Sequence, residues 1–167
     1  MNKRIVIING TAQVGKDTFI RYAMEYLTNM GQKCIELDSV AKVKVYGARL
    51  GWDGHKDSKG RRFLSDLKAL SDRYDGTTLY LREEIEATDA TVIFTHVREG
   101  DNIDKLKNLY PSLTTVLLER DDVVLYTNTS DSDVGDYIYD YHVENNGTLE
   151  QLQESAEFLM NEISKGE

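Results

Sequence analysis

The stretch that decides the fold is Ile5-Val6-Ile7-Ile8-Asn9-Gly10-Thr11-Ala12-Gln13-Val14-Gly15-Lys16-Asp17-Thr18. It opens with the continuous apolar run that is typical of a buried parallel strand, and a helical pattern follows it. Between the two, Gly10 and Gly15 allow the backbone to curl with its N–H groups pointing inward. The stretch therefore predicts a phosphate-binding loop for a nucleoside triphosphate, because the helix start adds its positive dipole end and Lys16 adds a full charge.

Lys16 would lie on the first helical turn, where a positive charge opposes the helix dipole unless an anion is bound. The standard pattern places Ser or Thr directly after this lysine to hold Mg²⁺, but here Asp17 follows and Thr18 comes next. A carboxylate can serve a hard cation directly or through water, so Asp17 and Thr18 are the candidate metal ligands. The alternative for Asp17 is an acidic residue that is favourable in a first helical turn without any metal. The candidate nucleotide ligands in the loop are Gly10, Ala12, Gln13, Val14, Gly15, Lys16, Asp17 and Thr18.

Composition excludes several classes of protein. The chain has 167 residues, 40% of them hydrophobic, which suits a single domain of residues 1–167 without a membrane span. A net charge of −9 disfavours a nucleic-acid binder, because phosphate backbones are held by clustered Lys and Arg. The single cysteine, Cys34, gives no sign of an oxidising compartment, and we expect a cytoplasmic protein.

Hydrophobic periodicity predicts strands alternating with helices, which implies an α/β fold with a parallel five-stranded sheet and helices on both faces. Such a sheet binds its ligands at the carboxyl ends of the strands. A helical insertion of about residues 39–88 and a lid-like polar loop of about residues 120–136 interrupt the alternation. The expected strands are residues 4–9, 34–37, 91–95, 114–119 and 137–143, and the expected helices are residues 16–30, 39–49, 61–74, 77–87, 101–110 and 148–164. Tyr137, Tyr139 and Tyr141 alternate along the last expected strand and are interpreted as sheet packing.

Charged side chains follow three of these strands and are candidates for catalysis. Asp38 can bind Mg²⁺ through water or accept a proton from an acceptor hydroxyl, and equally it can cap a helix. The planar fork of Arg98 can hold an acceptor phosphate or the transferred group. Arg120 can close over the triphosphate, or it can form a surface ion pair with Asp121 or Asp122. His96 can orient a phosphate or bond a backbone carbonyl.

Three segments resemble the P-loop nucleoside monophosphate kinase superfamily, and most closely the deoxynucleoside monophosphate kinase-like proteins of phages and bacteria. The first is Gly15-Lys16-Asp17-Thr18, because that family shows the same Asp-Thr pair after the lysine. The second is similar to the family's Arg-containing turn, and the third to its last strand and closing helix. These two segments are His96-Val97-Arg98-Glu99 and residues 139–149.

The resemblance implies an ATP- and Mg²⁺-dependent kinase that phosphorylates a small phosphorylated substrate, a nucleoside monophosphate or deoxynucleotide. It also places Asn145 and Asn146 beside the adenine, although Asn-Asn-Gly is ordinary turn chemistry as well. A kinase of another small metabolite is one alternative. A non-catalytic nucleotide-binding switch is the other, because the third strand ends in Thr95-His96 without the aspartate that often orients the metal in P-loop enzymes. The oligomeric state is left open, with a homodimer among the alternatives.

Overall fold

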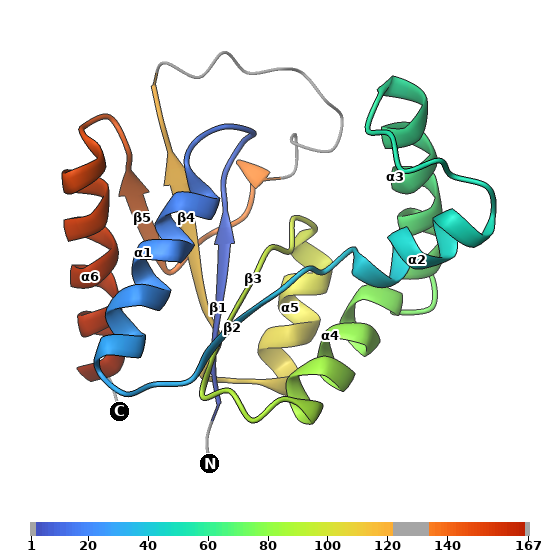
Figure 1. The fold of residues 1–167 in the computed structure, drawn as a ribbon. Coiled ribbons are helices and arrows are strands. Elements are labelled where there is room, and N and C mark those ends of the chain that lie inside the picture. Colours follow the sequence, from blue (N-terminus) through green and yellow to red (C-terminus); the bar gives the residue numbers. More distant parts are fainter. Residues whose placement is uncertain (1–2, 122–133, 166–167) are drawn as a thin grey trace. The chain divides into compact units, whose positions relative to one another are not determined.

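The computed structural model describes residues 3–121 and 134–165. The chain divides into two compact units, which we describe separately. The first unit comprises residues 1–36 and 89–167 and contains the sheet (Figure 1). The second unit comprises Leu37–Thr88 and is helical; its range is close to that of the expected insertion.

The first unit is built on a five-stranded sheet with the order β2-β3-β1-β4-β5. β1 pairs with β3 and with β4, β4 pairs with β5, and each of these pairs is parallel. In the register, Asn9 at the end of β1 lies opposite Leu117 of β4, and Ile7 lies opposite Thr95 at the end of β3. The loops that follow these strands therefore meet at one edge of the sheet. The strands are β1 (Arg4–Asn9), β2 (Cys34–Leu37), β3 (Val92–Thr95), β4 (Thr114–Glu119) and β5 (Tyr141–Glu144).

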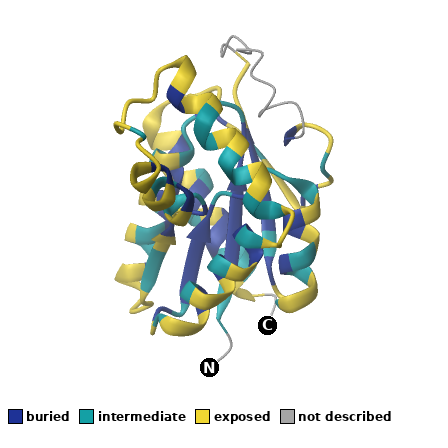
Figure 2. Cartoon of the chain, turned by 90° about the vertical axis from the view of Figure 1, so that its right-hand side faces the viewer, coloured by how far each residue is buried: buried dark blue, intermediate teal, exposed yellow. Residues whose placement is uncertain are grey.

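Helices cover both faces of this sheet. α1 (Lys16–Asn29) and α6 (Leu149–Lys165) pack together on one face, and α5 (Gly100–Leu109) lies on the other (Figure 1). β1, β3 and β4 are largely buried, whereas β2 and β5 are partly exposed and the helices expose their outer sides (Figure 2). Burying these apolar side chains is the main favourable term in folding. One core cluster joins β1, β3 and β4 to α1 and α6 and includes Val6, Ile8, Phe19, Ala23, Phe94, Val116, Leu118, Leu152, Ala156 and Leu159.

The second unit contains α2 (Ala41–Arg49), α3 (Ser58–Asp72) and α4 (Gly76–Ala87). Its connection from α3 to α4 is held by Asp72, which accepts hydrogen bonds from Lys68 Nζ at 2.7 Å and from the backbone N–H of Thr77 at 3.0 Å. Burial alone would raise the pKa of Asp72, but the bonds from Lys68 and Thr77 outweigh it and hold the pKa below its ordinary value.

The α/β fold expected from the sequence is confirmed, and two details of it are wrong. The last strand begins at Tyr141 instead of Tyr137, because side chains fix the segment before it: the Asp140 carboxylate accepts from the backbone N–H and the hydroxyl of Thr115, each at 2.8 Å. The polar stretch before residue 61 is partly helical, because the Asp57 carboxylate caps the backbone N–H of Gly60 at 2.7 Å and α3 begins at Ser58.

No helix among residues 3–121 and 134–165 is long and apolar enough to cross a membrane.

Candidate functional site

The loop between β1 and α1 is shaped by two glycines with positive φ, 149° at Gly10 and 98° at Gly15. A Cβ added to Gly10 would lie 2.3 Å from the carbonyl oxygen of Leu118, so the start of the loop lies directly against the backbone of β4. A Cβ added to Gly15 would lie 2.6 Å from the Nδ2 atom of Asn145. The loop is therefore closely packed at both ends, and a side chain at either glycine would displace its neighbours.

Lys16 folds back over this loop. Its Nζ atom donates hydrogen bonds to the carbonyl oxygens of Gly10 at 2.8 Å and Thr11 at 2.6 Å. No side chain caps the helix at Gly15, the N-cap residue of α1. The ammonium group and the amino end of α1 thus share one concave turn, which is the arrangement that binds an anion.

Asn145 supports the loop from the turn after β5. Its Nδ2 atom donates to the carbonyl oxygen of Val14 at 2.9 Å, and its backbone N–H donates to the carbonyl oxygen of Glu119 at 2.7 Å. Val14 and Asn145 are 1% and 7% exposed, so the side-chain bond is shielded from water. The structure brings Asn145 to the loop, where its amide donates to the loop backbone. A contact of Asn145 with the adenine stays a prediction.

Asn146 differs from its neighbour because it is exposed and points to the end of β4. Its side chain accepts from the backbone N–H of Asp121 and donates to the Asp121 carboxylate, both at 2.9 Å. Arg120 directly precedes this contact and is also exposed. The rest of the lid-like loop, residues 122–133, lies outside the described residues.

The two candidate metal ligands lie on the first turn of α1. Asp17 is 96% exposed and Thr18 is half-buried. The Oδ1 atom of Asp17 lies 3.9 Å from the Nε2 atom of His96, and the Oε1 atom of Glu36 lies 3.4 Å from the same nitrogen. Two carboxylates and an imidazole thus converge beside the loop, although they do not form a three-residue metal cluster within the described part of the chain.

Sequence reasoning missed Glu36 as a member of the site. The signal was a charged residue within the otherwise apolar β2, one position before the strand ends. For His96, the expected bond to a backbone carbonyl is confirmed: its Nδ1 atom lies 2.6 Å from the carbonyl oxygen of Ile8. Because a carbonyl oxygen only accepts, Nδ1 carries the hydrogen, and Nε2 is left facing Glu36 and Asp17.

Arg98 lies in the turn between β3 and α5 and is half-buried. The residue before it, Val97, is 1% exposed, and its carbonyl oxygen accepts a hydrogen bond from Asn9 Nδ2 at 2.6 Å. Asn9 ends β1 and directly precedes Gly10. The turn that carries Arg98 is therefore tied to the residue from which the β1–α1 loop starts.

Asp38 belongs to the second unit. Its Oδ1 atom accepts from the backbone N–H of Val40 at 3.0 Å, and its carboxylate pairs with Lys44. This bond closes a short turn before α2, whose N-cap residue is Val40 and has no side-chain cap, so the expectation that Asp38 caps the helix is wrong. A role of Asp38 in the reaction stays a prediction.

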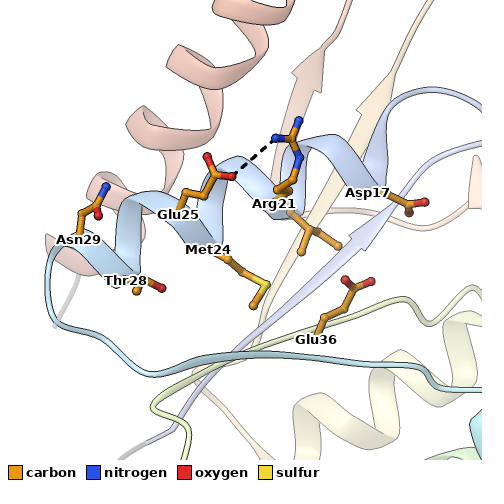
Figure 3. Close-up of a pocket in the computed structure, with 8 residues that line it drawn as sticks. Asp17, Arg21, Met24, Glu25, Thr28, Asn29 and Glu36 are labelled. Carbon is orange, nitrogen blue, oxygen red and sulfur yellow. Dashed lines mark ion pairs between the residues drawn. The ribbon is translucent and has the colours of Figure 1, made fainter.

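A cavity of about 690 Å³ runs along α1 beside β2, away from the glycines of the loop (Figure 3). Asp17 lies at one end of it, Asn29 at the other, and Glu36 faces α1 across it. The dashed line in Figure 3 marks the ion pair of Arg21 with Glu25, 3.6 Å long. Of the candidate site residues, Asp17 and Glu36 line the cavity, so it lies beside the β1–α1 loop and not within it.

No known family model and no curated protein sequence matches this chain. Solved structures do match it along nearly the whole length. Shikimate kinase from Aquifex aeolicus has 15% sequence identity and a TM-score of 0.53, over 98% of this chain and 99% of that one. Shikimate kinase from Acinetobacter baumannii in complex with shikimate has 16% identity and a TM-score of 0.53, over 99% and 94%. A putative kinase from Chloroflexus aurantiacus has 11% identity and a TM-score of 0.52, over 93% and 97%.

At these identities the likeness concerns the fold. The chain shares the α/β fold of these kinases, and its residues 10–18 include the connection from β1 to α1.

Proposed function

We propose that this protein is an ATP- and Mg²⁺-dependent phosphotransferase. The observation that carries the proposal is the turn formed by Gly10, Gly15 and Lys16, where an ammonium group and an uncapped helix start lie over a closely packed loop. A polyphosphate would take the place of the carbonyl oxygens of Gly10 and Thr11 as a partner of the Lys16 ammonium group.

Within this proposal Asp17, Thr18 and Glu36 would hold the magnesium ion. Mg²⁺ keeps several waters and needs only one or two carboxylates besides phosphate oxygens, so the lack of a three-residue cluster within the described residues does not count against it. When bound, the ion neutralises charge on the phosphates. Glu36 would supply the carboxylate that Thr95-His96 lacks at the end of β3.

The protein's own part in the reaction would be to position and stabilise charge. Lys16 and the backbone N–H groups of Gln13 to Thr18 would hold the triphosphate, and Arg98 would hold the acceptor phosphate or the transferred group by paired hydrogen bonds. Arg120 would close the site from the end of β4, and Asp38 would receive a proton from the acceptor hydroxyl.

For the acceptor we propose a nucleoside monophosphate, including deoxynucleotides. The support is the resemblance of residues 15–18, 96–99 and 139–149 to deoxynucleoside monophosphate kinase-like proteins, in which Asn145 and Asn146 would lie beside the adenine. The second unit, Leu37–Thr88, would supply the acceptor side, and residues 120–136 the lid. We place the protein in the cytoplasm, on the evidence of its single cysteine.

Another small metabolite is the second candidate acceptor. The observation that favours it is the match to shikimate kinases at a TM-score of 0.53. A nucleotide-binding switch without turnover is the third candidate, and the absence of an aspartate after Thr95 favours it. The three candidates differ in whether ATP is consumed and in which acceptor receives the phosphoryl group.

The test is to incubate the purified protein with ATP and Mg²⁺ and follow ADP release, with and without each acceptor. The acceptor panels are nucleoside monophosphates, their deoxy forms, and hydroxyl-bearing small acids. The Lys16→Ala variant serves as the control for contaminating kinases. Turnover that requires a monophosphate supports the proposal. Turnover only with another metabolite would show that the acceptor is the second candidate. Tight ATP binding without any product would overturn it in favour of the switch.

A further inference from the structure

The side-chain amide nitrogen of Asn9 is buried and uses both of its hydrogens within the protein. Asn9 is 2% exposed, and its Nδ2 atom donates to the carbonyl oxygen of Val97 at 2.6 Å and to the hydroxyl of Tyr139 at 3.0 Å. An amide nitrogen carries two hydrogens, so both are used within the protein. Asn9 Nδ2 is therefore not a ligand for a substrate, although Asn9 directly precedes the phosphate loop.

Tyr139 fixes the direction of this amide. Its hydroxyl accepts from Asn9 and donates its own hydrogen to the carbonyl oxygen of Val134 at 3.0 Å. The ring is 6% exposed, packs with Leu117 and Val134, and meets the ring of Tyr137 edge-on at 5.2 Å. Burial raises the pKa of the Tyr139 hydroxyl, so it stays protonated and keeps this donor role.

The bond to Val97 acts on Arg98. The carbonyl oxygen of Val97 and the backbone nitrogen of Arg98 belong to one planar peptide unit, so a bond that fixes the oxygen also fixes where the Arg98 side chain starts. Asn9 is also joined through the chain to Gly10, which lies directly against the Leu118 carbonyl. One side chain thus connects the base of the phosphate loop to the turn that carries the arginine.

We propose that Asn9 is a positioning residue for phosphoryl transfer, which holds Arg98 in register with the phosphate loop while Tyr139 keeps the Asn9 amide oriented. The inference rests on the proposed function, in which Arg98 meets the acceptor phosphate or the transferred group. A displacement of such a group by about 1 Å can cost on the order of a hundredfold in rate. A network that served stability alone would have no such effect beyond a loss of folded protein.

Three variants separate positioning from stability. Asn9→Ala removes both hydrogen bonds, and Tyr139→Phe removes only the hydroxyl and keeps the ring. Ile7→Val lies two residues away on the same strand and removes one fully buried methylene, while both partners of the bond between Asn9 and Val97 are kept. In a transfer assay we expect Asn9→Ala to lower kcat/KM for the acceptor by about 10- to 100-fold and Tyr139→Phe by less, while Ile7→Val stays near wild type.

The decisive measurement repeats Asn9→Ala and Tyr139→Phe in the Arg98→Ala background. If Asn9 acts through Arg98, neither variant lowers kcat/KM further there, whereas independent effects would multiply and overturn the proposal. If Asn9→Ala does not fold, the effect of Tyr139→Phe on kcat/KM with and without Arg98 provides the same test. ATP affinity, measured by calorimetry, should change by less than about twofold in both variants, since the loop itself is intact.

A readout that needs no turnover keeps this proposal distinct from the proposed function. The Nε order parameter of Arg98, measured by ¹⁵N relaxation, should fall in Asn9→Ala and Tyr139→Phe and stay at the wild-type value in Ile7→Val. If wild type transfers phosphate to no acceptor, the proposed function fails while this result still stands. An unchanged order parameter in both variants overturns the positioning role, whatever the activity.

Discussion

The Nδ2 atom of Asn145 donates a hydrogen bond to the carbonyl oxygen of Val14, across 131 residues of sequence and at 2.9 Å. The turn after the last strand therefore holds the phosphate loop after the first strand. Because Val14 is buried, no water can replace this donor if it is removed. The shape of the loop thus depends on a residue near the other end of the chain.

Replacing Asn145 with Ala should destabilise the protein by about 1–3 kcal/mol, because the Val14 carbonyl is left buried without this donor. The measurement is urea unfolding without nucleotide. Asn146→Ala is the matched control: it removes an exposed amide bonded to Asp121 and should cost less than about 0.5 kcal/mol. Equal losses in the two variants would contradict the support that we assign to Asn145.

Gly15→Ala should weaken ATP binding as well as stability. The new Cβ would lie 2.6 Å from Asn145 Nδ2, at a residue whose φ of 98° is already strained for any side chain. Gly51 offers a matched control because its φ is also 98° and a Cβ there meets nothing within 4 Å. Gly51→Ala should show only the strain of about 1–2 kcal/mol, with ATP affinity unchanged by calorimetry. An ATP affinity in Gly15→Ala equal to that of Gly51→Ala would refute the prediction.

Lys16→Ala should lower the affinity for ATP by about 10- to 100-fold, since a hydrogen bond to a charged group contributes about 1.5–3 kcal/mol. Isothermal calorimetry in the presence of Mg²⁺ measures this directly. Lys165→Ala, which removes an exposed lysine paired with Glu162 at the end of α6, should leave the affinity unchanged. The same affinity in wild type and Lys16→Ala would remove the basis for a triphosphate site.

Arg98→Ala should lower kcat/KM for the acceptor by about a hundredfold or more and leave ATP affinity within about twofold. Arg98→Lys should not restore the rate, because an ammonium group lacks the planar fork of a guanidinium. As a control, Arg21→Ala removes an exposed arginine of α1 and should keep full activity. A loss of ATP affinity in Arg98→Ala as large as that in Lys16→Ala would assign Arg98 to the nucleotide instead.

Asp72→Asn should destabilise the protein by about 1–3 kcal/mol at pH 7 and change its response to acid. The wild-type carboxylate has its pKa held below the ordinary value of 3.8, so its contribution is complete above that pH and is lost as the pH falls through the lower, folded-state value. Asp72→Asn has no carboxylate to protonate, so the unfolding free energies of wild type and the variant should become more alike as the pH falls. Asp66→Asn, in the same helix but 76% exposed, should change neither quantity. A constant difference between wild type and Asp72→Asn from pH 7 to pH 3 would contradict the assignment.

Local sequence was sufficient for most of the fold. The apolar runs of β1 and β4 and the helical spacing in α1 and α6 each depend on neighbouring residues, and their expected positions agree with the structure to within one residue. The start of β5 was wrong because it depends on distant partners. Tyr139 bonds Asn9, 130 residues away, and Asp140 bonds Thr115, so the segment before Tyr141 does not join the strand.

The candidate site divides in the same way. Glycine spacing and Lys16 pointed to the loop directly, because they act through the backbone around them. The contribution of Glu36 becomes visible only when β2, β3 and α1 are brought together around His96. The double use of the Asn9 amide likewise has no local signature, since it requires Val97 and Tyr139 to meet at the end of β1.

The chain leaves the sheet at β2 and returns to it at β3, the immediate neighbour of β2, so Leu37–Thr88 is one excursion bounded by adjacent strands. A cassette bounded in this way can be exchanged during evolution while the strands around it keep their partners. A different helical segment could therefore replace Leu37–Thr88 while the turn around Lys16 is kept. Chimeras that exchange only Leu37–Thr88 would therefore change the helical unit and leave the sheet with its present strands.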